Sequence, residues 1–379
     1  GGLMRILHTA DWHLGKLVYG VSMLEDQEAF LEETLYPVIE QERPDCLVLS
    51  GDIFDRSIAP PQAIRLFEAC VLKLCKTYRL PLLAISGNHD GADRIAPAAQ
   101  LLREQGVYIA TKIEDAFSPI ALEKDGTAYH FHLLPYFEPA ELRTYYKNEE
   151  IRGFSEAYRA ASGHIAQGFD KKAVHILCAH CFVTGCTVSD SESPIYVGGS
   201  GEVSASLFEP FDLTLLGHLH APQKAGENVF YSGSPLKYSF DEEHQKKSLS
   251  IIDIEGKDYE IRRIPVKAKH DMKTLTGSFD GLCEKGCQKK DDDYIFVSLT
   301  DGRPVYMPVD RLREYYPNIL GLKSEFLSRT QAKSEKKISR TSTDEEIFNL
   351  FLTQICSSEA TAGDRALFLQ AMNQAREES

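Results

Sequence analysis

The chain has 379 residues, 43% of them hydrophobic, and a formal net charge of −14. This is enough to bury a large core and to form two domains and a tail. No apolar run approaches the roughly 20 residues of a membrane span, no signal peptide stands at the start, and the nine cysteines are odd in number and scattered. These features exclude a membrane span and a disulfide scaffold, so we expect a reduced, cytoplasmic protein.

Short apolar runs alternate with helical patterns in the first third of the chain. The apolar runs are often β-branched and end in loops, as buried strands do. A Pro60-Pro61 pair is well placed to open a helix. The sequence predicts strands at residues 5–8, 46–49 and 82–85, and helices at 24–41, 61–78 and 92–105.

The middle of the chain changes from mixed elements to mostly strands. Residues 120–122 and 129–134 flank Asp125-Gly126, a turn pair typical of a hairpin. Helices are predicted at 139–148 and 154–167, and strands at 174–177, 213–216, 229–231, 249–254 and 259–266. Together these elements predict an α/β fold, a two-sheet sandwich flanked by helices.

A smaller α/β unit follows. It is predicted from strands at 294–299 and 319–323 and a short helix at 308–315 opened by Pro308. Beyond a polar linker, two short helices divided at Gly363 have apolar stripes and need another surface to pack on. The expected boundaries are 4–268 for the first domain, 269–327 for the second, 328–342 for the linker and 343–379 for the helical segment.

Five polar segments follow five of the predicted strands. They are Asp11-Trp12-His13, Gly51-Asp52-Ile53-Phe54-Asp55, Gly87-Asn88-His89-Asp90, Ala179-His180 and Gly217-His218-Leu219-His220. Each alone has an ordinary explanation, because a single histidine at a strand end is more often a hydrogen-bonded core residue, and glycine and asparagine suit turns. Their joint occurrence, each after an apolar strand, predicts a site for two metal ions.

The residue types at these positions indicate which metal ions the site would bind and which reaction it would support. Two carboxylates, four imidazoles and a carboxamide suit Mn(II), Fe or Zn better than an all-oxygen calcium site. Asp52 is the natural bridge, since a shared carboxylate holds two ions about 3.5 to 4 Å apart, the spacing that suits a phosphoryl centre. His89 suits a general acid, because an imidazole with a pKa of about 6.5 can protonate a leaving oxygen at neutral pH.

The ordered motifs resemble the calcineurin-like metallophosphoesterase superfamily. Residues 6–15, 50–55, 194–199 and 216–220 are similar to its SbcD branch, the nuclease subunits of bacterial SbcC-SbcD complexes. The similarity is strong over residues 4–265. Beyond them, only the arrangement of segments along the chain is similar. It implies that one metal is held by Asp11, His13, Asp52 and His220, and the other by Asp52, Asn88, His180 and His218. It also implies that His89 is the general acid, and we expect Asp90 to orient the His89 ring.

The resemblance has further implications for activity and partners. It implies a Mn(II)-dependent exonuclease on duplex DNA ends and endonuclease on hairpins and single strands, working in DNA end processing, repair and recombination. Residues 269–327 would be a DNA-facing cap, and the C-terminal helices would dock on an SbcC-type coiled-coil ATPase. No phosphate-binding loop motif occurs in this chain, so any ATP dependence would come from that partner. The helices at 62–78 and 92–105 would form a two-fold homodimer, although core packing explains their apolar residues equally well.

The sequence alone leaves several interpretations open. A net charge of −14 would repel DNA at long range, although two bound divalent cations would make the charge at the site itself positive. Arg262, Arg263, Lys267 and Lys269 are candidate DNA contacts, with a solvated edge as the equal alternative. Cys178, Cys181 and Cys186 are better explained as small buried residues than as a zinc site. The alternative functions are a small-molecule or phosphoprotein phosphoesterase and a DNA-tethering scaffold with a vestigial metal site.

Overall fold

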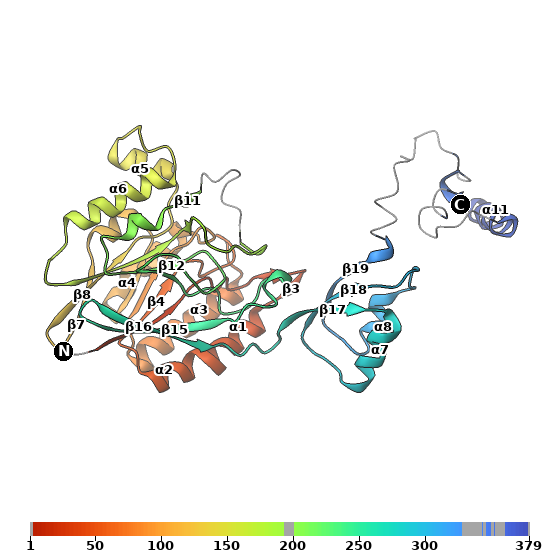
Figure 1. Cartoon of the computed structure of the whole chain (residues 1–379), viewed down its shortest axis with the longest axis horizontal. Coiled ribbons are helices and arrows are strands. Elements are labelled where there is room, and N and C mark those ends of the chain that lie inside the picture. Colours follow the sequence, from red (N-terminus) through yellow and green to blue (C-terminus); the bar gives the residue numbers. More distant parts are fainter. Residues whose placement is uncertain are drawn as a thin grey trace. The chain divides into compact units, whose positions relative to one another are not determined.

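The computed structural model describes residues 3–192, 201–327, 343, 346–349, 352 and 361–377. It divides into two compact units, Gly1–Asp271 and Met272–Ser379, each with its own core (Figure 1). The division follows Asp271, close to the predicted boundary after residue 268. Within the described ranges, no helix combines the length and the apolar content that crossing a membrane requires.

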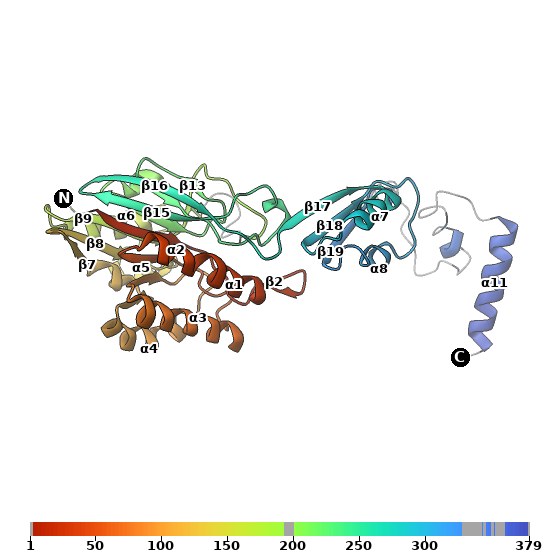
Figure 2. The ribbon, with the colours of Figure 1, turned by 90° about the horizontal axis from the view of Figure 1, so that it is seen from below.

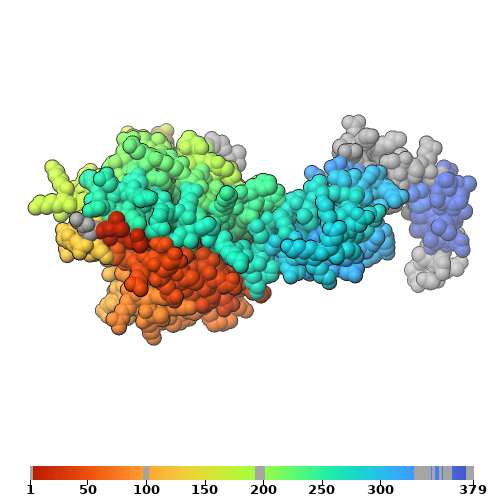
Figure 3. All heavy atoms as spheres, turned by 60° about the horizontal axis from the view of Figure 1, so that its bottom comes forward, coloured from red at the N-terminus to blue at the C-terminus, as the bar shows by residue number. Residues whose placement is uncertain are grey.

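The first sheet of the larger unit contains five of the predicted strands, β1, β4, β5, β15 and β16. Its order is β16-β15-β1-β4-β5-β6, in which β1, β4, β5 and β6 run parallel while β15 and β16 are antiparallel. The pairing of β1 with β15 brings the chain near residue 250 beside the N-terminus, as Figure 3 shows at the surface. The bounds are Met4–Thr9 (β1), Cys46–Ser50 (β4), Leu82–Ile85 (β5), Val107–Ala110 (β6), Ser248–Glu255 (β15) and Asp258–Pro265 (β16).

The second sheet has the order β13-β14-β12-β9-β8-β7, with β14, β12, β9 and β8 parallel and antiparallel strands at both edges. The predicted hairpin is confirmed, since Asp125 and Gly126 both have positive φ, 47° and 84°, between β7 and β8. The bounds are Ile120–Lys124 (β7), Thr127–Leu133 (β8), Val174–His180 (β9), Leu213–Gly217 (β12), Gln223–Lys224 (β13) and Val229–Tyr231 (β14). Shorter strands are Leu17–Val18 (β2), Val21–Ser22 (β3), Phe182–Val183 (β10) and Glu202–Val203 (β11).

The two sheets pack face to face around one apolar core. Val48 and Leu83 from the first sheet and Ile176 and Leu215 from the second are buried in it. Successive side chains of a strand point to opposite faces, so the alternate residues of β4 face away from this core. All five β4 side chains are nevertheless buried, which requires helices on the outer face.

Helices cover the outer faces as the sequence predicts. α1 to α4 lie along the first sheet in Figure 2, in red to orange. α6 packs on the second sheet, where Phe154, Tyr158 and Ile165 share a buried cluster with Leu177 and Leu216. The bounds are Leu24–Phe30 (α1), Leu31–Leu35 (η1), Tyr36–Glu42 (α2), Pro61–Lys73 (α3), Leu74–Tyr78 (η2), Ala92–Leu102 (α4), Arg103–Gln105 (η3), Pro139–Tyr146 (α5) and Phe154–Gln167 (α6). Short helical turns lie at Ile113–Phe117 (η4), Ala205–Phe208 (η5) and Phe240–Glu242 (η6).

The second unit contains a three-stranded parallel sheet, β17-β18-β19, together with helices α7, α8 and α11. Its core includes Phe279, Leu282, Ile295 and Val297. The bounds are Met272–Gly277 (β17), Phe279–Gln288 (α7), Tyr294–Leu299 (β18), Pro308–Leu312 (α8), Ile319–Ser324 (β19) and Ala362–Glu377 (α11). The predicted break at Gly363 is wrong, because this residue lies in the first turn of α11. The predicted linker and the motif at 194–199 lie outside the described residues.

Candidate metal centre

The predicted site residues meet because the two sheets bring strand ends to one rim. The carboxyl ends of β1, β4 and β5 lie along one edge of the first sheet, and those of β9 and β12 along one edge of the second. The two edges touch where His180 Nδ1 lies 2.8 Å from the Ser50 carbonyl oxygen. Gly217 permits this approach, since a Cβ there would lie 1.8 Å from the same oxygen.

The loops after these strands hold their side chains with unusual backbone conformations. Asp11, His13, Asp52 and His218 have positive φ values of 54°, 45°, 48° and 102°. Such conformations cost non-glycine residues about 1–3 kcal/mol and cluster at functional sites. The Asp11 and His13 amides donate to the carbonyls of Gly51 and Asp52, at 3.1 and 2.9 Å, and this pairing holds the strained loops together.

The first group that could hold a cation consists of Asp11, His13 and His220. All three are buried, and their ligand atoms lie within 4.8 Å of one another. His13 Nε2 faces His220 Nε2 at 3.1 Å. The Asp11 carboxylate is fixed by the His218 amide, which lies 2.9 and 3.1 Å from its two oxygens.

The second group consists of Asp52, His180 and His218, again buried and within 4.8 Å. Asn88 joins it, because its Oδ1 lies 3.0 Å from His180 Nε2 and 3.2 Å from His218 Nδ1. His180 Nε2 also lies 3.4 Å from Asp52 Oδ2. The structure therefore brings together all seven residues that the sequence suggests as ligands, in two adjacent groups.

The chemistry of these groups fits cations. Burial lowers the pKa of His13 well below its usual value and that of His218 to about 3, so both imidazoles are neutral and keep a lone pair. Burial raises the pKa of Asp11, with repulsion from Asp52 adding to it and His180 opposing it. His13 Nδ1 has no hydrogen-bond partner among the described residues. When a buried site has more hydrogen-bond acceptors than donors, a divalent cation can satisfy the acceptors that remain.

His89 and Asp90 have different surroundings from those expected. The His89 Nδ1 lies 2.8 Å from the Asp55 carbonyl oxygen, and the ring packs edge-on against His13 with centroids 4.8 Å apart. The Asp90 carboxylate instead accepts the amides of Ile53, Phe54 and Gly87, at 3.1, 2.9 and 2.8 Å. The expectation that Asp90 orients the His89 ring is therefore wrong, because both oxygens bind backbone N–H groups. Asp90 ties together the loops that present Asp52 and His89.

Comparison with known proteins agrees with this geometry. The sequence pattern of calcineurin-like phosphoesterases matches residues 4–222, more than half of the chain. The chain belongs to this family. Within it, the chain falls in the SbcD branch, since the SbcD component of the SbcCD nuclease from Staphylococcus epidermidis is 32% identical over 340 residues, 89% of this chain and 90% of that relative. The pattern described as a type 5 capsule protein repressor C-terminal domain matches residues 268–355 of this phosphoesterase. A dimetal phosphatase from Danio rerio has 12% identity and a TM-score of 0.39 over 70% of this chain and all of its own, too low to support an argument.

In this phosphoesterase, a set of polar residues around the ligand loops was not predicted from the sequence. Glu242, Lys247 and Ser191 surround His220 from segments with no motif of their own. Gln27 donates to the carbonyls of Trp12 and His13, at 3.1 and 2.8 Å, from inside helix α1. A buried glutamine in a predicted amphipathic helix is the one signal that sequence offered, and it does not identify its partners.

The four basic residues predicted as DNA contacts are not equivalent in this phosphoesterase. Arg262 lies 2.7 Å from Glu42, and Lys269 pairs with Glu25, so neighbouring carboxylates already neutralise these two cations. Arg263 and Lys267 are exposed and line a cavity of about 620 Å³. For these two residues, DNA contact stays a prediction.

Proposed function

We propose that this phosphoesterase is a Mn(II)-dependent DNA nuclease that hydrolyses phosphodiester bonds at a two-metal site. One observation carries the proposal: Asp52 Oδ2 lies 3.6 Å from His13 Nε2 in the first ligand group and 3.4 Å from His180 Nε2 in the second. A single carboxylate within reach of both groups suits two ions that share a ligand. Family membership supports phosphoester chemistry at this rim.

The ligand sets follow from the two groups. Asp11, His13, Asp52 and His220 would hold one ion, and Asp52, Asn88, His180 and His218 the other. The mixed nitrogen and oxygen ligands, without thiolate, favour Mn(II). When bound by these residues, two divalent ions would supply an activated water at neutral pH and would neutralise charge on the phosphoryl oxygens.

His89 would protonate the leaving oxygen. Its ring stands against His13, so the imidazole borders the first ligand group. The Asp55 carbonyl oxygen lies 2.8 Å from Nδ1 and would fix the ring, so that Nε2 would serve as the proton donor. Asp90 would act through the backbone, by setting the loop that carries His89 relative to Asp52.

The DNA substrate is supported by the relative and by the charge around the site. The Staphylococcus epidermidis relative is called a nuclease. Arg263, Lys246 and Lys267 are exposed in the wall of the 620 Å³ cavity, and the two lysines have no carboxylate partner in the described part of the chain. Lys247, also in this wall, donates to the His220 carbonyl at 2.9 Å, so the cationic cavity adjoins a ligand of the first group. A phosphate backbone that leads to the metals would follow this wall.

The name of the relative also supports a partner. It is one component of an SbcCD nuclease, so an SbcC-type coiled-coil ATPase is the partner that we propose for this chain. The second unit would be the DNA-facing cap, and residues 343–379 would dock on the ATPase. Helix α11 is consistent with docking, because Leu367 and Leu369 are 71% and 49% exposed.

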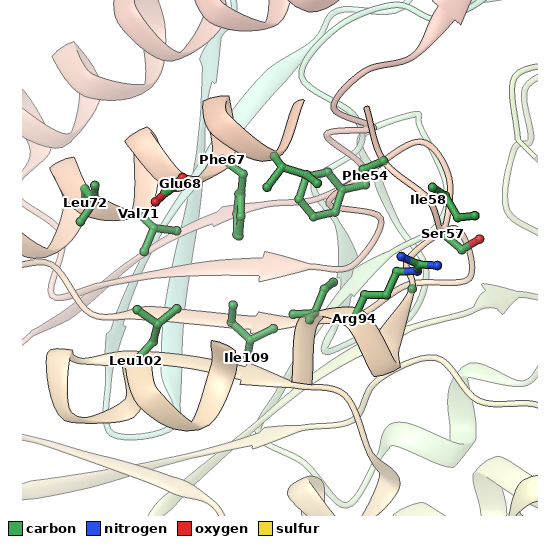
Figure 4. Close-up of a pocket in the computed structure, with 14 residues that line it drawn as sticks. Phe54, Ser57, Ile58, Phe67, Glu68, Val71, Leu72, Arg94, Leu102 and Ile109 are labelled. Carbon is green, nitrogen blue, oxygen red and sulfur yellow. The ribbon is translucent and has the colours of Figure 1, made fainter. Parts of the chain in front are cut away.

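We also propose a homodimer through α3 and α4. A cavity of about 480 Å³ between these helices is lined mainly by apolar side chains, among them Phe54, Phe67 and Val71 (Figure 4). Ile58, Ile64 and Leu72 on its border are 66%, 49% and 45% exposed. Exposed apolar patches of this kind mark interaction surfaces, and the same face on a second copy could cover it in a two-fold contact.

A substrate comparison tests the proposed function. Labelled duplex DNA, labelled hairpin DNA and a nitrophenyl phosphodiester would each be incubated with Mn(II), Mg(II) or chelator. We expect cleavage of all three with Mn(II) and none with chelator. Cleavage of the nitrophenyl compound alone would indicate a small-molecule phosphoesterase, and cleavage of none would indicate a DNA-binding scaffold.

A further inference from the structure

A buried network surrounds His220 on the side away from His13. His220 Nδ1 lies 2.6 Å from Ser191 Oγ and 3.3 Å from Glu242 Oε1, and Ser191 also hydrogen-bonds to Glu242. The Lys247 ammonium lies 2.5 Å from Glu242 Oε2. Glu242 is 0% exposed and Lys247 is 7% exposed, so both charges lie inside the protein.

We propose that Glu242 is a positioning residue that fixes the tautomer and the orientation of His220, with Lys247 as its buried counter-ion. This inference rests on the proposed function, in which His220 binds one of the two metals. It adds a residue that acts through a ligand and does not touch the metal or the substrate.

The hydrogen-bond chemistry assigns the proton. A carboxylate only accepts hydrogen bonds, and the Ser191 hydroxyl uses its hydrogen for Glu242, so both atoms facing His220 Nδ1 are acceptors. The proton of the neutral imidazole therefore sits on Nδ1. The lone pair is left on Nε2, the nitrogen that faces His13 Nε2 at 3.1 Å inside the first ligand group.

The same ion pair also holds the backbone of the ligand. Lys247 Nζ donates to the His220 carbonyl and to Ser234 Oγ, both at 2.9 Å. On the amide side, Glu192 Oε1 accepts from the His220 N–H at 2.6 Å. His220 is thus held at its ring, its N–H and its carbonyl by three buried or half-buried charged residues.

A purely structural role explains this arrangement poorly. Removing two charges from water costs more than packing apolar side chains of similar volume, so a buried ion pair is weak evidence for stability. Here both charged groups contact one proposed ligand. Carboxylates that orient metal-bound histidines typically account for a 10- to 100-fold difference in metal affinity.

Two variants of the full-length protein separate the roles. Glu242→Gln removes the charge on the carboxylate and leaves the buried Lys247 ammonium without this counter-ion, so the melting temperature of the variant should fall. The double variant Glu242→Gln/Lys247→Met removes both charges and should recover much of that loss. Glu243→Gln is the matched control, because its carboxylate pairs with the exposed His244 at 3.1 Å.

Mn(II) binding, measured by titration calorimetry together with thermal melting, is the readout. We expect both Glu242 variants to bind one Mn(II) as wild type does and the other about 10- to 100-fold more weakly, while the control binds both normally. Wild-type affinity at both sites in the double variant would overturn the inference and leave the proposed function intact. Failure of the wild-type protein itself to bind two Mn(II) would overturn the proposed function and the inference with it.

Discussion

His89 lies beside the first ligand group but belongs to neither of the two groups proposed to hold metal ions. Its loss should therefore slow the reaction and leave metal binding unchanged. We expect His89→Asn to keep two bound ions and to cleave DNA at least about 100-fold more slowly, the usual scale of lost general acid catalysis. Elemental analysis and single-turnover cleavage on the same preparation measure both effects. An unchanged rate, or loss of a metal, would contradict the assignment.

Gly87 is a residue where even a small change should disturb the site. A Cβ there would lie 2.1 Å from Asp52 Oδ1 and 2.4 Å from the Asp52 amide nitrogen. Gly87→Ala should therefore lower the free energy of unfolding by about 1–3 kcal/mol and weaken metal binding, because the loops must separate. Gly163→Ala is the control, since that position is exposed in α6 with open space around it and alanine there should stabilise by about 0.5–1 kcal/mol. Denaturant unfolding and metal titration of both variants check this, and equal behaviour would refute it.

The ligand residues could be predicted because each lies at the carboxyl end of a strand with a clear apolar pattern or in the loop after it. Parallel strands bring their carboxyl ends to one edge, so Asp11, Asp52 and Asn88 had to meet in space. The direction of a neighbouring side chain does not follow from the same rule. Asp90 is adjacent to His89 in sequence, yet it turns to three backbone amides. Glu242 comes from a short turn without periodicity, so only the fold brings it to His220.

At the scale of elements, the strands and helices predicted for the larger unit agree with their observed positions, but β6 and the short strands β2, β3, β10, β11 and β13 were not predicted there, nor were β17 and α7 in the second unit. α7 contains Gly281 and Gly286, which lower its helix propensity. They make the helical pattern of apolar residues, which includes Phe279 and Leu282, harder to recognise in the sequence. Packing explains one of these glycines. A Cβ at Gly286 would lie 2.4 Å from the Tyr315 Cβ, so the close contact requires the residue that weakens the pattern.

The exposed apolar face formed by α3 and α4 leads to a prediction about dimer formation. Ile64→Glu combined with Leu72→Glu should convert a dimer into a monomer, because two charges would be buried in the proposed two-fold contact. Leu17→Glu serves as control, since Leu17 is also 49% exposed but lies on β2, outside this face. Light scattering well above the assay concentration measures the mass. A monomeric wild type, or an unchanged dimer in the double variant, would refute the interface.

At the scale of the whole molecule, two units with separate cores allow catalysis and partner binding to be separated. Deletion of residues 343–379 should leave metal-dependent cleavage of simple substrates intact. It should abolish co-purification with an SbcC-type ATPase and any stimulation by ATP. Cleavage assays, pull-down and thermal melting on the truncated protein test this. A large loss of basal activity with partner binding retained would mean that the segment stabilises the nuclease instead.

The central claim is that Asp52 would contribute to both metal sites, and that the two bound ions would supply the chemistry for phosphodiester hydrolysis. Its most direct test is a Mn(II) titration of chelator-treated protein, with bound metal and nitrophenyl phosphodiester cleavage followed together, for wild type and Asp52→Asn. We predict that wild type is inactive without metal, that its activity saturates at two ions per chain, and that Asp52→Asn fails to retain both ions. Activity that survives chelation, or two tightly bound ions in Asp52→Asn, would contradict the account.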